Sequence, residues 1–364
     1  MDATAPARAH AAETRPSEAS AAYAPRRLPG VVSAASVPVG SGRARQPVSA
    51  ASADAGEWQY SAVGVDQVPS RILAAAGRIT IAVIDTGADV TTPALVGKVH
   101  GTYDVRDGRR TVPDHDGHGT LVASLAGGVS RGGDGVEGFG GAVRLLVVKV
   151  SNSTTFSDVD VAAGIVYAVR HGARIINLSV AGTEPSVVEK AALEFAARHG
   201  VLVIAAVGND AQAGDPPEYP AALLQPIGSN GVGGLGLAVG ASDINGARAD
   251  FSEYGSFVSL AAPGAAVFGA LPTRASAHLL SPVRVPSTSD TSYGYASGTS
   301  FAAPEVAGVA ALVWAADPRL TFRQVATILK QTASGHGTWS PDLGYGVINA
   351  AAAVQRAAAA AHTG

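Results

Sequence analysis

The sequence Arg-Ile-Thr-Ile-Ala-Val-Ile at residues 78–84, followed at once by Asp85-Thr86-Gly87, is the stretch that decides the fold. A short run of apolar and β-branched residues that ends at a glycine-containing turn predicts a buried strand. Four later runs have the same character: 143–150, 174–180, 201–207 and 235–241. Helical spacing lies between them at 159–171 and 187–199, and each of these segments stops at a glycine, which suits a helix end.

Strands that alternate with helices of this length indicate a mostly parallel sheet with helices on both faces, which is an α/β fold. The segment 300–315 is apolar nearly all round, so we expect a central, buried helix there. Residues 321–331 predict another helix. Two stretches without periodicity, 211–234 and 271–293, are expected to be loops.

Composition divides the chain into three segments. Residues 1–57 are rich in Ala, Pro, Ser and Arg and show little periodicity, so we expect a disordered N-terminal arm or the remnant of a pro-segment. Residues 58–355 predict one folded domain. Residues 356–364 read as an Ala-rich C-terminal tail.

Several classes of protein are disfavoured by composition. The chain has no cysteine, which excludes disulfides, thiolate metal sites and a cysteine nucleophile. A net charge of -3 gives no general attraction to nucleic acid or to anionic membranes. We expect no membrane span, because we find no apolar run of about 18 residues. The polar first ten residues do not form a signal peptide, so composition leaves the compartment open.

Four polar side chains stand where predicted strands end or predicted helices begin: Asp85, His118, Asn209 and Ser300. Each has an ordinary explanation as well. Asp85 and Asn209 suit turns, His118 suits an exposed loop, and Ser300 suits a helix N-cap. The Asp-His-Asp-Gly-His stretch at 114–118 could also bind a metal, although the helical metalloprotease motif is absent.

The order Asp, His, Asn, Ser is the order of the subtilisins. The segments Ala-Val-Ile-Asp-Thr-Gly at 82–87, His-Gly-Thr-Leu-Val-Ala at 118–123 and Gly-Thr-Ser-Phe-Ala-Ala-Pro at 298–304 resemble the three motifs of the subtilase family. The resemblance covers residues from about 58 to 353. Leu121 and Phe301 replace a His and a Met that the family usually has, but neither position carries protons, so we expect activity to survive.

The resemblance implies a subtilisin-like, three-layer α/β fold and a serine endopeptidase. It implies a catalytic triad of Asp85, His118 and Ser300, with Asn209 stabilising the oxyanion. An extended polypeptide substrate would pair with the segment Ser179, Val180 and Ala181. One wall of the main specificity pocket would be lined by Ala206, Val207 and Gly208.

The resemblance further implies a monomer that needs no cofactor for its chemistry, and it favours a secreted or periplasmic enzyme. Structural calcium is not supported at the family's usual loop, where Asp134 is the clearest carboxylate, and calcium elsewhere stays open. No residue is assigned to a metal. The alternatives are a pseudoprotease that binds peptides without cutting them, and a transpeptidase or cyclase that uses the same acyl-enzyme.

Overall fold

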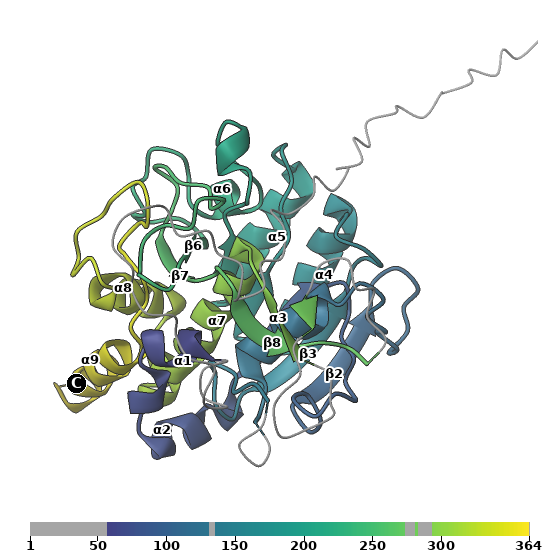
Figure 1. The fold of residues 1–364 in the computed structure, drawn as a ribbon, viewed down its shortest axis with the longest axis horizontal. Helices are drawn as coiled ribbons and strands as arrows, with labels where there is room; N and C mark the ends of the chain where they lie inside the picture. The colour runs from purple at the N-terminus through teal and green to yellow at the C-terminus, as the bar shows by residue number, and fades with distance from the viewer. Residues whose placement is uncertain (1–56, 131–134, 274–280, 283–292, 364) are drawn as a thin grey trace, which may run out of the picture.

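A seven-stranded sheet runs through the middle of the protein, whose computed structural model describes residues 57–130, 135–273, 281–282 and 293–363 (Figure 1). The strand order is β2-β3-β1-β4-β5-β6-β7, and every neighbouring pair is parallel. The strands are β1 (Thr80–Asp85), β2 (Val99–Asp104), β3 (Arg144–Lys149), β4 (Ile175–Leu178), β5 (Leu202–Ala206), β6 (Gly236–Ser242) and β7 (Leu260–Pro263). The predicted α/β class is confirmed.

Strand β1 explains why the sheet is covered on both faces. Successive side chains of a strand point to opposite sides. Ile81 and Val83 therefore join one hydrophobic core, while Ala82 and Ile84 join the other. An uninterrupted apolar run can stay out of water only when both faces are packed, and this is what the continuous run at 78–84 predicted.

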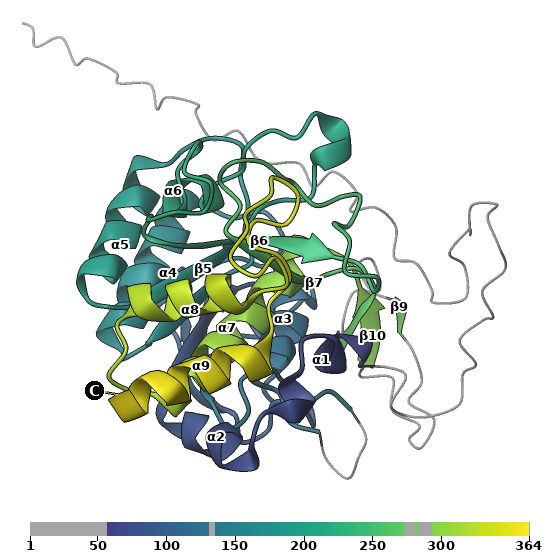
Figure 2. The same cartoon turned by 90° about the vertical axis from the view of Figure 1, so that its left-hand side faces the viewer.

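Helices form a layer on each side of the sheet (Figure 2). One core includes residues of α3 (His118–Gly127), α7 (Thr299–Ala316), α8 (Phe322–Thr332) and α9 (Ala350–Thr363). The other includes residues of α4 (Asp158–Arg170), α5 (Val187–Arg198) and the short α6 (Ala221–Leu224). The expected three-layer arrangement is thus confirmed.

Helix α7 lies in the centre of its layer and packs against α3, α9 and strands β4 to β7. Within the described part of the chain it is the one helix whose length and composition would suit a membrane span, and 83% of it is buried inside the fold. The helix meets this test by its mean hydropathy, but Thr299, Ser300 and Glu305 interrupt its apolar run, so the expectation that no unbroken apolar run reaches this length is not contradicted. The burial gives the run another explanation, since a core helix must be apolar on most sides.

Several short elements were not predicted. The N-terminal part of the domain forms α1 (Trp58–Ala62) and α2 (Ser70–Ala75), each followed by a 3₁₀ turn, η2 (Val65–Gln67) and η3 (Ala76–Arg78). A small antiparallel sheet contains β8 (Val267–Ala270), β9 (Ser281–Pro282) and β10 (Tyr293–Ala296). The expected loop 211–234 holds η4 (Ala211–Ala213) and α6, while most of the expected loop 271–293 lies outside the described residues.

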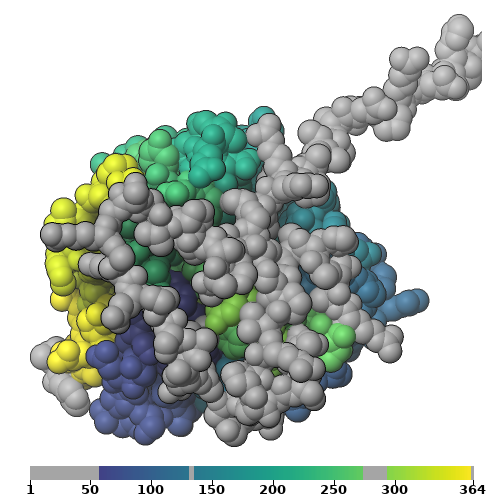
Figure 3. Space-filling view, in the orientation of Figure 1, coloured from purple at the N-terminus to yellow at the C-terminus, as the bar shows by residue number. Residues whose placement is uncertain are grey.

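The chain closes on itself at one side of the domain. The first residue of α9, Ala350, donates its N–H to Val63 O over 2.8 Å, and the N-terminal helices lie beside the C-terminal one (Figure 3). The expected tail 356–364 instead continues α9 as far as Thr363, because Ala357 is buried in the core. Of the expected arm 1–57, all but the last residue lies outside the described residues.

Candidate active site

Asp85 ends β1, the strand from which the sheet grows in both directions: towards β3 and β2 on one side and towards β4 on the other. In open α/β sheets, ligands bind at the carboxyl ends of the strands at such a switch point. The Asp85 carboxylate is fully buried. Its Oδ1 atom accepts hydrogen bonds from the Thr86 N–H and from His118 Nδ1, both at 2.7 Å.

His118 is the first residue of α3, and a glycine follows it for a steric reason. A Cβ atom at Gly119 would lie 2.1 Å from Gly87 O and 3.1 Å from Asp85 Oδ1. Only a residue without a side chain lets the start of α3 come this close to the loop after β1. This close approach brings the imidazole of His118 to the carboxylate of Asp85.

Asp114 fixes the loop that leads into α3, a role that the sequence did not reveal. Its two carboxylate oxygens accept five hydrogen bonds between 2.6 and 3.2 Å. The donors are the hydroxyl groups of Thr86 and Thr120 and the backbone N–H groups of Asp116, Gly117 and Thr120. This carboxylate therefore organises the loop. The available signal was an Asp that comes before two turn-forming residues.

The electrostatics around His118 favour its charged form. Burial lowers the pKa of this imidazole, but the charge of Asp85 and the hydrogen bond to it outweigh burial and raise the pKa to about 9. Asp116 and Asp114 add to the rise. Because the imidazolium is stabilised by a partner on its Nδ1 side, the Nε2 atom is left to exchange a proton with another group.

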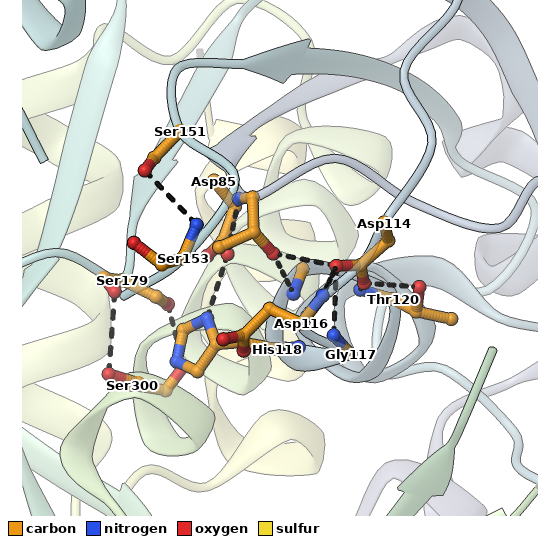
Figure 4. A network of polar contacts seen from close by, with 12 residues as sticks. Asp85, Asp114, Asp116, Gly117, His118, Thr120, Ser151, Ser153, Ser179 and Ser300 are labelled. Carbon is orange, nitrogen blue, oxygen red and sulfur yellow. Dashed lines mark hydrogen bonds and ion pairs between the residues drawn. The ribbon is translucent and has the colours of Figure 1, made fainter. Parts of the chain in front are cut away.

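Ser300 stands in the first turn of α7, beside this pair. Its backbone carbonyl accepts a 2.6 Å hydrogen bond from Ser179 Oγ, and its own Oγ lies 3.4 Å from Ser179 O. The next residue, Phe301, has its ring centre 5.3 Å from that of His118. In Figure 4 the imidazole lies between Asp85 and Ser300. First-turn N–H groups have no acceptor within the helix, so they favour negative charge at this position.

Asn209 lies at the same helix start. It follows Gly208 after β5, and its Oδ1 accepts hydrogen bonds from the Thr299 N–H at 2.9 Å and from Thr299 Oγ1 at 3.1 Å. The structure thus brings together Asp85, His118, Asn209 and Ser300, which are distant in the sequence.

Comparison of the chain with known proteins identifies its family. The model of the family described as "Subtilase family" matches residues 77–346. The chain belongs to the subtilase family. It is 35% identical over 280 residues to thermitase of Thermoactinomyces vulgaris, an alignment that covers 76% of this chain and 88% of thermitase. It is 33% identical over 299 residues to M-protease of Shouchella clausii, with 82% of this chain and 70% of that protein covered.

Among solved structures, this subtilase is similar to fervidolysin of Fervidobacterium pennivorans, a keratinolytic enzyme related to subtilisin. The two share 29% identity and a TM-score of 0.71, over 86% of this chain and 48% of fervidolysin. A protease of Pseudoalteromonas arctica PAMC 21717 is 27% identical with a TM-score of 0.67, over 83% of this chain and 97% of that one. By family, the chain is a serine-type endopeptidase and therefore a hydrolase.

The predicted substrate-binding residues of this subtilase lie at the ends of two neighbouring strands. Ser179 and Val180 are buried and Ala181 is half-buried, directly after β4. Ala206, Val207 and Gly208 are buried at the end of β5, which pairs with β4. Across the switch point, Ser151 follows β3, and Ser151 Oγ accepts a hydrogen bond from the Ser153 N–H at 3.2 Å (Figure 4).

Within the described ranges, no group of three or more His, Cys, Asp or Glu residues could hold a metal ion. Near the acids of 114–118 lies instead a buried cation, Lys149, whose Nζ donates to Thr86 O and, at 2.8 Å, to Pro113 O. Burial lowers the pKa of this Lys, while Asp114 opposes the change. Asp134 lies outside the described residues.

Proposed function

We propose that this subtilase hydrolyses peptide bonds through an acyl-enzyme on Ser300, with Asp85, His118 and Ser300 as a catalytic triad. The observation that carries the proposal is the 2.7 Å contact between Asp85 Oδ1 and His118 Nδ1, made beside the first turn of α7. In such a triad the base is oriented by a buried carboxylate on one side and faces the nucleophile on the other.

The steps follow from these positions. Ser300 Oγ attacks the scissile carbonyl carbon while His118 Nε2 takes the hydroxyl proton, and the proton then passes to the leaving amine. Asp85 holds the imidazole tautomer and stabilises the imidazolium. Water attacks the acyl-enzyme in the same manner and releases the second product, with His118 again acting as the base.

The oxyanion of each tetrahedral intermediate lies near the start of α7. Asn209 Nδ2 and the Ser300 N–H are the donors that we assign to it, since each can point at the developing charge without reorganisation. The peptide substrate lies extended along Ser179, Val180 and Ala181 and pairs with them as an added strand. Ala206, Val207 and Gly208 form a wall for the side chain before the scissile bond.

We propose that the chemistry uses no cofactor and that the enzyme acts as a monomer outside the cytoplasm, in keeping with its membership of the subtilase family. The peptidase domain begins at residue 58, and residues 1–57 take no part in catalysis. Helix α1 supports this boundary because it packs against β8, where Gln59 Nε2 donates a 2.8 Å hydrogen bond to Phe268 O.

The test combines a serine-directed covalent probe with a peptide library read by mass spectrometry. We expect a fluorophosphonate to label Ser300 and the library to yield hydrolysed products. Labelling without any product would indicate a pseudoprotease, and products joined to an added amine would indicate a transpeptidase. Absence of labelling in the folded protein would contradict the triad. No observation in the described residues favours either alternative.

A further inference from the structure

Two buried carboxyl groups lie directly behind Gly208. The residues Glu218 and Glu253 are 1% and 0% exposed. A Cβ atom at Gly208 would lie 2.6 Å from Glu218 Cδ and 2.7 Å from Glu253 Cδ. Glu253 also donates its backbone N–H to Gly208 O over 3.2 Å. The glutamate pair therefore packs directly against the backbone of Gly208, the residue before Asn209.

The pair is short of hydrogen-bond donors. Apart from contact between the two carboxyl groups, Glu218 Oε1 and both carboxyl oxygens of Glu253 have no hydrogen-bond partner in the described part of the chain. Burial is the main cause that raises the pKa of both groups, and each lies near further negative charge. Buried polar atoms are nearly always paired, so an unpaired set of this kind needs an explanation.

In the described part of the chain, the charged groups that act on the pair are all acidic. Asp210 and Asp215 raise the pKa of the pair further through their charges. Arg248 is the nearby cation that acts on Asp215. Its guanidinium is already held by Asp342 Oδ1 at 3.3 Å and by Ser252 O at 2.6 Å. The region therefore has an excess of acidic groups.

The pair is tied to the substrate-binding backbone from two sides. Glu218 is followed by Tyr219, whose N–H and C=O exchange two 2.8 Å hydrogen bonds with Gly182, next to the proposed edge strand that ends at Ala181. On the other side, the Gly208 N–H donates to Thr299 Oγ1 at 3.2 Å, one residue before Ser300. The carboxyl groups thus lie between the edge strand, the end of β5 and the start of α7.

A bound peptide would direct one side chain to this place. With its carbonyl carbon at Ser300 and its carbonyl oxygen at Asn209, the chain before the scissile bond lies along 179–181. Gly208 is adjacent to Asn209 and has no side chain, so the residue before the scissile bond passes over the Gly208 backbone, against which the two carboxyl groups pack. A cationic end group there would provide the donors that the carboxyl oxygens lack.

We propose that Glu218 and Glu253 form the acidic floor of the main specificity pocket, which makes this enzyme prefer peptide bonds that follow arginine or lysine. The proposal rests on the proposed function, because it takes Ser300 as the nucleophile. A protonated, closely spaced pair is a poor site for a cation, so binding of Arg or Lys displaces the shared proton. Since the raised pKa values mean that the pair ionises only as the pH rises, the preference for a cation grows with pH.

Two peptides that differ only in arginine or citrulline before the cut test the proposal, because citrulline has almost the same shape and no charge. For the wild-type enzyme we expect kcat/KM to be about 10–100-fold higher for arginine, the range of a charged hydrogen bond. In Glu218→Gln and Glu253→Gln this ratio should fall several-fold. Glu194→Gln, on the outer face of α5, is the matched control and should keep the ratio. Equal rates for both peptides in the wild type would overturn the proposal.

A binding measurement separates this proposal from the peptidase assignment. With the Ser300→Ala variant, calorimetry in two buffers of different ionisation enthalpy measures both affinity and proton release. We expect tighter binding and release of a proton for the arginine peptide only. If arginine is preferred in binding but nothing is cleaved by the wild type, the proposed function fails and the pocket stands. If leucine and citrulline peptides are cleaved and bound as well as arginine peptides, the pocket assignment fails and the peptidase stands.

Discussion

The backbone N–H of Thr299 donates a 2.9 Å hydrogen bond to Asn209 Oδ1. An N–H group can only donate, so the amide atom that faces it must be the oxygen. The amide of Asn209 is therefore held in one orientation, with Nδ2 directed away from Thr299. A single contact at the start of α7 thus prepares the donor that we assign to the oxyanion.

This geometry predicts different effects for two substitutions. Asn209→Asp keeps an oxygen for the Thr299 N–H but removes the donor, so the melting temperature should change little while kcat falls. We expect a loss of about 10²–10³ in kcat, a magnitude measured for the oxyanion-hole Asn of a subtilisin. KM should be nearly unchanged, since the contact strengthens only in the transition state. An effect confined to KM would remove Asn209 from this role.

Ser300→Ala should abolish peptide hydrolysis and leave the fold intact. A hydroxyl at the start of a helix contributes little packing, and the Ser300 carbonyl that accepts from Ser179 Oγ is retained in the variant. We expect turnover to fall by at least about 10⁴-fold, as in other Ser–His–Asp enzymes. Assays with purified variant and far-ultraviolet circular dichroism check both statements. Wild-type turnover in this variant would rule out the triad.

The activity on a neutral peptide should rise with pH up to about 9. The pKa of His118 is raised to about 9 because Asp85 stabilises the imidazolium, so the neutral imidazole, which is the base, becomes abundant only near that pH. On acidification kcat/KM should fall without unfolding, which circular dichroism can follow in parallel. A flat profile between pH 5 and 8, with chemistry rate-limiting, would contradict the assignment of His118 as the base.

Asp114→Asn should lower both stability and turnover. Asp114 Oδ2 accepts hydrogen bonds from the Thr120 N–H and from Thr120 Oγ1. If an NH₂ group takes the place of Oδ2, it cannot accept these bonds, and the buried donors lose their partner. We expect the free energy of unfolding to fall by about 1–3 kcal/mol. Denaturant titration in a Ser300→Ala background avoids self-digestion. Asp107→Asn, in an exposed turn, is the control and should stay within about 0.5 kcal/mol.

Removal of residues before Glu57 should leave melting temperature and peptidase activity unchanged. The prediction comes from composition: the segment 1–56 has too little apolar surface to offset an ordering cost of about 1–2 kcal/mol per residue. The test begins with folded protein that is trimmed by limited proteolysis, because related proteases often need a pro-segment to fold. Unfolding after such a cut, or strong amide protection within residues 1–50, would show that the domain boundary is misplaced.

Much of the sheet could be predicted from the sequence because it is buried on both faces. Strands β1, β3, β5 and β6 are continuous apolar runs, and helices α4 and α5 end two residues before Gly172 and Gly200, which have positive φ. Strand β2 was missed, because its residues such as His100 and Thr102 are polar and partly exposed. Helix α9 was not predicted, since a run of alanines does not show which of them, like Ala357, are buried in the core.

The residues of the candidate site could be predicted where each one lies in a short sequence motif, as Asp85 and His118 do. The network of Asp114 could not be predicted, because its five donors come from the loop after β1, the loop before α3 and the first turn of α3, whose approach depends on the fold. Glu218 and Glu253 were missed for the same reason. They lie 35 positions apart, in segments without periodicity, and only the structure brings both to Gly208.

Among the triad candidates, Asp85 comes from the first strand of the sheet and Ser300 from a helix near the end of the domain, so most of the chain separates these two residues. During synthesis, a growing chain that already contains Asp85 and His118 has no nucleophile and no α7 to support the sheet. Hydrolytic capacity can arise only after almost the whole domain has been made and docked, since such long-range contacts form late in folding. Activity is therefore a direct reporter of completed folding, and unfinished chains are unable to digest one another.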